Sequence, residues 1–96
     1  MAERIVKWSI KAQKEYSDML DWYFFNKSGQ YVETIMKNVQ KAIATISAFP
    51  TVGVVEKITS KRVYRSIITH PKSRLYYWYD EDSVHIVRFV NTQTDY

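Results

Sequence analysis

Apolar residues recur every three or four positions in two segments of the first half of the chain, from Ile10 to Phe25 and from Ser28 or Gly29 to Ala48. This period predicts two amphipathic helices. Ser9 is the expected N-cap of the first helix, because its hydroxyl can accept a free N–H of the first turn. A polar break at residues 26–29 and Pro50 after the second segment then predict an antiparallel helical hairpin.

The second half of the chain is rich in β-branched and aromatic residues and has short polar breaks. We expect strands in KRVYRSIITH (61–70), RLYYWY (74–79) and VHIVRFVN (84–91), and a first strand in RIVKW (4–8). Residues 51–60 have no clear period and predict a loop, with at most a short strand at Val52–Val55. The order β-α-α-β-β-β predicts one α+β domain over residues 1–96, with the hairpin on one face of a small antiparallel, partly mixed sheet.

Composition narrows the classes of function. A chain of 96 residues that is 46% hydrophobic is folded rather than disordered, and the absence of cysteine excludes disulfides and thiolate chemistry. We find no signal peptide or membrane span and expect a cytoplasmic protein. The formal charge of +4 favours anionic partners, either nucleic acid or an acidic protein.

Strand alternation places Arg74, Tyr76 and Trp78 on one side of their strand. We expect Arg65 to join them on the open face, which is the face of the sheet that the helices leave uncovered. Guanidinium groups bind phosphate and aromatic rings stack on unpaired bases. The alternative is that these are solvated arginines beside ordinary aromatic pairs. Neither set of side chains on the last strand is cleanly polar, so its orientation stays open.

Other chemistries find little support in the sequence. His70 and His85 lack the spacing of metal ligands, and His70 is expected to be exposed in a turn beside Pro71. The acidic residues at 80–82 are typical of a solvated turn between strands. With two glycines there is no glycine-rich phosphate loop, and no Ser-His-Asp arrangement is present. We therefore expect neither a metal nor another cofactor.

Three stretches together resemble the RelE/ParE superfamily, the toxins of type II toxin–antitoxin systems, which include plasmid stabilisation proteins. They are VKWSIKAQKEYSDMLDWY, IMKNVQKAIATISAFPTVG with its Phe-Pro-x-x-Gly ending, and YRSIITHPKSRLYYWYDEDSVHIVRFVN. The resemblance covers nearly the whole chain. It implies a growth-inhibiting toxin that a cognate antitoxin neutralises. Assembly as a homodimer or as a toxin–antitoxin hetero-oligomer stays open.

The resemblance implies one of two targets. RelE-like members cleave messenger RNA on the ribosome without a metal, using basic side chains of the open face and a C-terminal arginine and tyrosine. ParE-like members lack this set and bind DNA gyrase. We expect the endoribonuclease by a narrow margin. A gyrase inhibitor, or an inactive RNA- or protein-binding module on the same fold, remains as the alternative.

Carried over residue by residue, the resemblance implies that Arg65, Arg74 and Tyr96 are catalytic. Ile67 and Gln93 stand where the superfamily carries basic residues, so two expected charges are missing. Loss of charge at these positions would weaken stabilisation of the phosphorane transition state. The expected nucleic-acid-binding residues are Lys61, Arg62, Lys72, Tyr76, Trp78 and Arg88.

Overall fold

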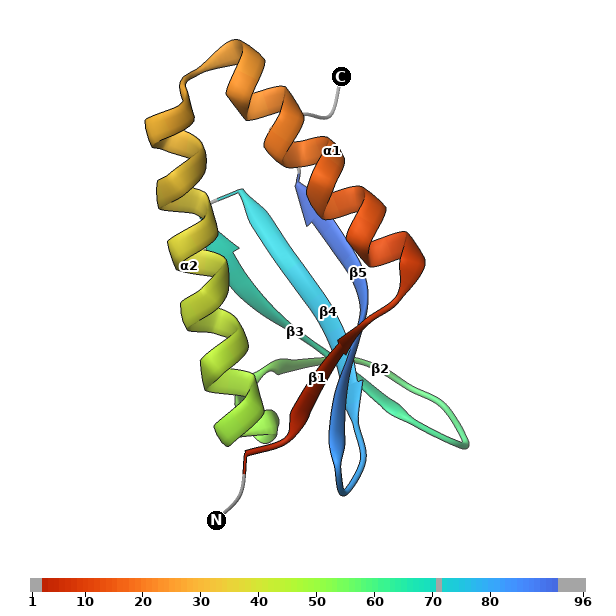
Figure 1. The fold of residues 1–96 in the computed structure, drawn as a ribbon. Coiled ribbons are helices and arrows are strands. Elements are labelled where there is room, and N and C mark those ends of the chain that lie inside the picture. Colours follow the sequence, from red (N-terminus) through yellow and green to blue (C-terminus); the bar gives the residue numbers. More distant parts are fainter. Residues whose placement is uncertain (1–2, 71, 92–96) are drawn as a thin grey trace.

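The computed structural model describes residues 3–70 and 72–91, which form a helical hairpin packed on a five-stranded sheet (Figure 1). Its elements are β1 (Ile5–Trp8), α1 (Ile10–Asn26), α2 (Gly29–Ala48), the 3-10 helix η1 (Pro50–Val52), β2 (Val54–Ile58), β3 (Val63–His70), β4 (Ser73–Tyr79) and β5 (Ser83–Asn91). The strand order is β1-β5-β4-β3-β2, and β1 pairs with β5 in parallel while the other pairs are antiparallel. The predicted α+β architecture is confirmed.

Residues 51–60 differ from the prediction. They contain most of η1 and the whole of β2, which lies further along the chain than the short strand at Val52–Val55. All five residues of β2 are exposed, so neither face of the strand has to be apolar. Its sequence, VVEKI, therefore lacks the alternation of apolar and polar residues that identifies a strand. Its extended form follows from pairing with β3, interrupted by a bulge at Glu56.

The predicted N-cap of α1 is confirmed, and α2 also begins at a serine cap. Ser9 Oγ accepts the N–H of Ala12 at 3.0 Å, and Ser28 Oγ accepts the N–H of Tyr31 at 3.1 Å. Each cap satisfies a donor that the first turn leaves free. α1 lies along β5 and α2 along β3 (Figure 1). Within the described residues, neither helix is long and apolar enough to cross a membrane.

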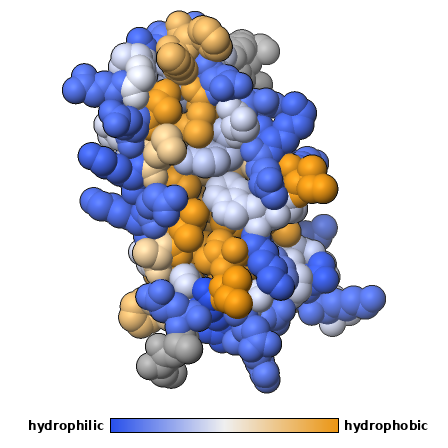
Figure 2. Space-filling model, in the orientation of Figure 1, coloured by the Kyte–Doolittle hydropathy of each residue, from blue (hydrophilic) through white to orange (hydrophobic). Residues whose placement is uncertain are grey.

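The core lies between the hairpin and one face of the sheet. Its largest fully buried side chains are Tyr23, Tyr77, Ile35, Ile46, Leu75, Ile86, Val39 and Val84. Seen from the helical side in Figure 2, apolar side chains run down the middle of the surface and hydrophilic side chains flank them. The helical period predicts that the apolar face of each helix packs toward the sheet, where these buried residues lie.

Tyr77 attaches the end of the hairpin to the sheet. Its hydroxyl donates to the carbonyl of Pro50 at 2.8 Å and accepts the N–H of Gly53 at 3.0 Å. A Cβ on Gly53 would lie 2.8 Å from the carbonyl oxygen of Ser66 and would also meet the Tyr77 ring. The glycine of the Phe-Pro-x-x-Gly stretch is therefore required for space.

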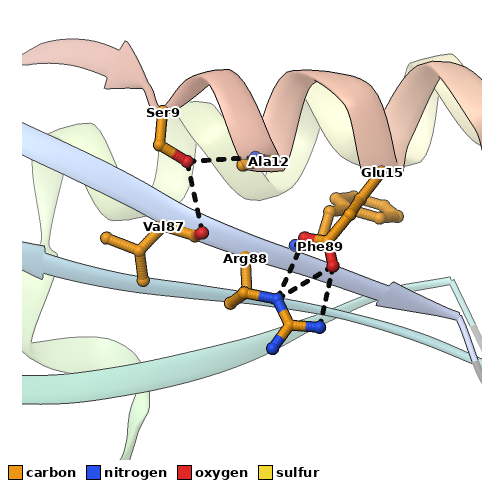
Figure 3. A network of polar contacts seen from close by, with 6 residues as sticks. All are labelled: Ser9, Ala12, Glu15, Val87, Arg88 and Phe89. Atoms are coloured by element: carbon orange, nitrogen blue, oxygen red, sulfur yellow. Dashed lines mark hydrogen bonds and ion pairs between the residues drawn. The ribbon is translucent and has the colours of Figure 1, made fainter.

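The β1/β5 edge of the sheet is held by the helices. Beyond its pairing with β1, β5 presents the carbonyl of Val87 to Ser9 Oγ at 3.2 Å and the N–H of Phe89 to Glu15 Oε1 at 2.9 Å (Figure 3). The outer carbonyl of Trp8 in β1 accepts from Gln13 Nε2 at 3.2 Å. These contacts satisfy backbone groups that an edge strand would otherwise leave open.

Candidate functional site

The pairing of β3 with β4 decides which side chains share the open face. Ser66 lies opposite Tyr76 and Ile68 opposite Arg74, so these residues point away from the helices. Arg65 lies opposite Tyr77, whose side chain is fully buried on the helical side. The prediction that Arg65 shares a face with Arg74, Tyr76 and Trp78 is therefore wrong.

Arg65 holds the connection between α2 and β2. Its Nη1 donates to the carbonyls of Thr51 at 3.1 Å and Gly53 at 3.0 Å. Its Nε is buried with no hydrogen-bond partner among the described residues. Because Ile67 lies opposite the buried Leu75, the position of the missing second basic residue also faces the helices.

Arg74 lies on the open face but is paired with an acid. Its Nη1 donates to Ser66 Oγ at 2.8 Å and lies 3.6 Å from Glu56 Oε2. Ser66 Oγ donates in turn to Glu56 Oε2 at 2.5 Å. About a third of each charged side chain remains exposed, 35% for Arg74 and 36% for Glu56. The arginine therefore meets any ligand with its charge already partly neutralised.

A bulge in β5 explains why its sequence has no clean alternation. The register shifts between the pairs Tyr76–Arg88 and Tyr77–Ile86, so Val87 is the extra residue. Ile86 and Phe89 consequently both face the helices, whereas Arg88 begins on the open face. β1 pairs with β5 only as far as Ile86, so the edge of β5 is free of a neighbouring strand at Arg88. The Arg88 side chain reaches α1 there, and its Nη2 lies 2.7 Å from Glu15 Oε2 (Figure 3).

Trp78 lies between two side chains from neighbouring parts of the sheet. The ring of His85 on β5 stacks on it at 4.0 Å with an interplanar angle of 9°. The guanidinium of Arg62, which comes from the β3 side, lies 4.0 Å from the same ring system. Because β3 and β5 flank β4 on opposite sides, both faces of the indole are covered. A nucleobase can stack on Trp78 only after one of them moves.

Asp80 fixes the β4–β5 turn and orients His85. Its Oδ1 accepts the N–H groups of Asp82 and Ser83, and its Oδ2 lies 3.0 Å from His85 Nε2. These hydrogen bonds, led by that from His85, lower the pKa of Asp80 to about 2. The acidic turn predicted from the sequence is thereby a hydrogen-bonded turn whose first carboxylate is fully engaged.

His70 is not the exposed turn residue that its neighbour Pro71 suggests. It ends β3 and is half-buried against α2, where its Nε2 lies 2.9 Å from the hydroxyl of Tyr31 and its Nδ1 lies 3.4 Å from Asn38 Nδ2. Burial lowers the pKa of His70. Among the described residues, no three potential ligands gather to hold a metal ion.

The other predicted residues that the structure describes are spread over several elements. Lys61 and Arg62 are exposed in the turn between β2 and β3, and Lys72 is exposed next to the start of β4. Gln93 and Tyr96 lie outside the described residues. Sequence reasoning missed Glu15 and Glu56, the partners of Arg88 and Arg74, because no local spacing links residues that lie far apart along the chain. It also missed His85, the partner of Trp78, because this pair depends on the register of the β4–β5 hairpin.

Residues 6–96 match the family model described as the ParE toxin of the type II toxin–antitoxin system parDE. The search of curated proteins found no match.

Three solved structures share the fold. A chain of the chromosomal ParDE toxin–antitoxin system from P. aeruginosa matches with a TM-score of 0.72 at 11% identity, covering 93% of this chain and 96% of that one. The YoeB dimer from Staphylococcus aureus gives 0.57 at 22% identity, covering 91% and 94%. The E. coli DinJ-YafQ toxin–antitoxin complex gives 0.58 at 11% identity and covers 98% of both chains.

Proposed function

Because the chain belongs to the ParE toxin family of type II toxin–antitoxin systems, we propose that it stops growth by binding DNA gyrase and that a cognate antitoxin neutralises it. Family membership supports the role of toxin and an antitoxin as partner. The choice of gyrase over messenger RNA rests on the charges of the sheet. Action on gyrase also implies that the toxin works in the cytoplasm.

The observation that carries this choice is the separation of the arginines. Cleavage of RNA by its own 2′-OH needs a base and cations that converge on one phosphate. Arg65 and Arg74 point to opposite sides of the sheet. Arg74 is paired with Glu56, and Arg88 with Glu15. Within the described residues, therefore, the arginines expected to serve RNA cleavage do not form a common cationic centre.

Messenger RNA cleavage remains the second candidate because of His85. This histidine lies on the open face, is oriented by Asp80 and stacks on Trp78. A histidine oriented in this way by a carboxylate has the side chain that enzymes use most often as a general base. In this alternative His85 would act as the base, and Arg74 would have to leave Glu56 to reach the phosphate.

Induced expression distinguishes the two targets. We expect growth arrest with linear plasmid DNA released from trapped gyrase, while primer extension shows intact messages. His85→Ala should keep this activity, and Tyr64→Ala provides a control for loss of an aromatic side chain in the same sheet. Codon-spaced cuts in cellular messages that disappear in His85→Ala would overturn the gyrase proposal in favour of RNA cleavage.

A further inference from the structure

Two hairpin ends project from the sheet on the side away from the α1–α2 connection (Figure 1). Residues of both hairpins line a cleft. One hairpin joins β2 to β3 and the other joins β4 to β5. The cleft has a volume of about 490 Å³. It is distinct from the middle of the open face, where Arg74 and Glu56 meet. Its polar and aromatic lining includes Lys61, Arg62, Arg65, Trp78, Tyr79 and Asp80.

The charges of this cleft differ from those of the open face. Lys61, Arg62 and Arg65 line it, and none of them has a carboxylate partner among the described residues. The lining carboxylate, Asp80, is engaged by His85 and by two N–H groups of its own turn. Three cations and one engaged carboxylate leave the cleft positively charged and suited to an anion.

The structure also holds one of these cations, Arg62, in position. Thr59 Oγ1 accepts the N–H of Lys61 at 3.3 Å and that of Arg62 at 3.0 Å, which fixes the turn. The Arg62 guanidinium is then held against Trp78. A cation that is already positioned loses less conformational entropy when it binds a phosphate.

The aromatic residues at this end indicate which kind of nucleic acid fits. Arg62 and His85 cover both faces of Trp78, so the ring offers no free platform for an unpaired base. Sequence-specific recognition of single strands depends on such stacking, whereas duplex DNA is held largely through its phosphates. The cleft therefore has the cations for backbone contact and lacks a free stacking platform at Trp78.

We propose that the cleft binds the phosphodiester backbone of duplex DNA, with Lys61 and Arg62 as the contacting cations. This inference deepens the proposed function and rests on it, because the DNA is that held by gyrase. The toxin would then contact both the enzyme and its substrate. Arg65 supports the wall of the cleft through the carbonyls of Thr51 and Gly53.

Fluorescence anisotropy with a labelled DNA duplex tests the site. We expect Lys61→Ala/Arg62→Ala to weaken binding about tenfold or more at low salt and to reduce the slope of log K against log salt by about 2. The matched control is Lys37→Ala/Lys41→Ala, which removes the same charge from exposed positions of α2 and should lower affinity less than about threefold. Circular dichroism melting curves establish that both variants are folded.

Two results would overturn the inference. One is equal loss of affinity in both double variants, which would mean that net charge alone attracts DNA. The other is tighter binding of a single-stranded RNA of the same length than of the duplex. Capture of purified gyrase without DNA separates the two proposals. Toxin that binds gyrase but not the duplex contradicts the DNA site alone, whereas toxin that binds the duplex but not gyrase contradicts the proposed function.

Discussion

At the scale of single residues, Glu15 shows how one side chain connects a helix to a strand edge. Its carboxylate accepts from Arg88 and from the N–H of Phe89 (Figure 3). Burial by itself would raise the pKa of Glu15, but these hydrogen bonds and the nearby positive charge of Arg88 outweigh it and hold the pKa below its usual value. The charged form of Glu15 therefore stabilises the folded state.

Glu15→Ala should destabilise the protein at pH 7 by about 1–3 kcal/mol, because it leaves the Phe89 N–H without an acceptor. The folded-state pKa is lowered, so the contribution is complete above the unfolded-state value of about 4.3 and is lost as pH falls through the folded-state pKa. Urea unfolding at pH 7 and below pH 4 measures it. The difference between wild type and variant should shrink in acid.

Asp18→Ala is the matched control for this prediction. It breaks the exposed Lys14–Asp18 pair one turn further along α1, a type of contact that contributes less than about 0.5 kcal/mol. If Glu15→Ala costs no more than this control, or if its effect is the same in acid, then Glu15 does not hold the edge of β5 in the way described.

At the scale of elements, the two faces of β4 lie in different environments, the core on one side and the open face on the other. Leu75 and Tyr77 are fully buried against the helices, whereas Arg74 and Tyr76 are half-buried on the open face. This alternation was readable in the sequence because β4 is regular and its apolar face is continuous. The strand therefore allows a direct comparison of adjacent side chains that support different parts of the structure.

Leu75→Ala should lower the free energy of unfolding by about 2–5 kcal/mol, because it leaves a cavity in the core. Arg74→Ala, at the neighbouring position, should cost no more than about 1 kcal/mol, since its pair with Glu56 is partly exposed. Chemical denaturation of both variants measures the difference. A larger loss for Arg74→Ala would reverse the assignment of the two faces.

Most of the fold was predictable from the sequence, but the register of its strands was not. The helices, the Ser9 cap of α1 and three of the later strands follow from period and turn chemistry. Placing Arg65 with Arg74 failed because alternation describes one strand and does not specify which residue of the next strand lies opposite. The bulge at Val87 likewise moves Arg88 and Phe89 relative to the start of β5. A single sequence carries no clear signal for either.

At the scale of the whole molecule, structural support decreases across the sheet from β4 to β2. β4 is paired on both sides and packs under the hairpin, whereas β2 is paired on one side and all five of its residues are exposed. Local stability follows burial and pairing, so the two strands should open with different free energies. The candidate DNA cleft lies between the hairpin that contains β2 and the hairpin that contains β4.

Native-state hydrogen exchange should therefore show the slowest amides in β4 and the fastest strand amides in β2. The expected protection of Leu75 and Tyr77 approaches the global free energy of unfolding, because both are buried at the centre of the sheet. Amide exchange followed by NMR measures each site. Equal protection of β2 and β4 would contradict the gradient.

The unequal borders of the sheet limit how copies of this chain could join strand to strand. At one border, Glu15 of α1 and its N-cap Ser9 occupy hydrogen-bonding groups of β5 that a strand from another molecule would need. At the other, β2 offers a row of five exposed residues. A molecule with one free edge strand can pair with one other molecule, and the pair then has no free edge strand to which a third could add. Such joining would stop at two molecules and would not grow into a filament.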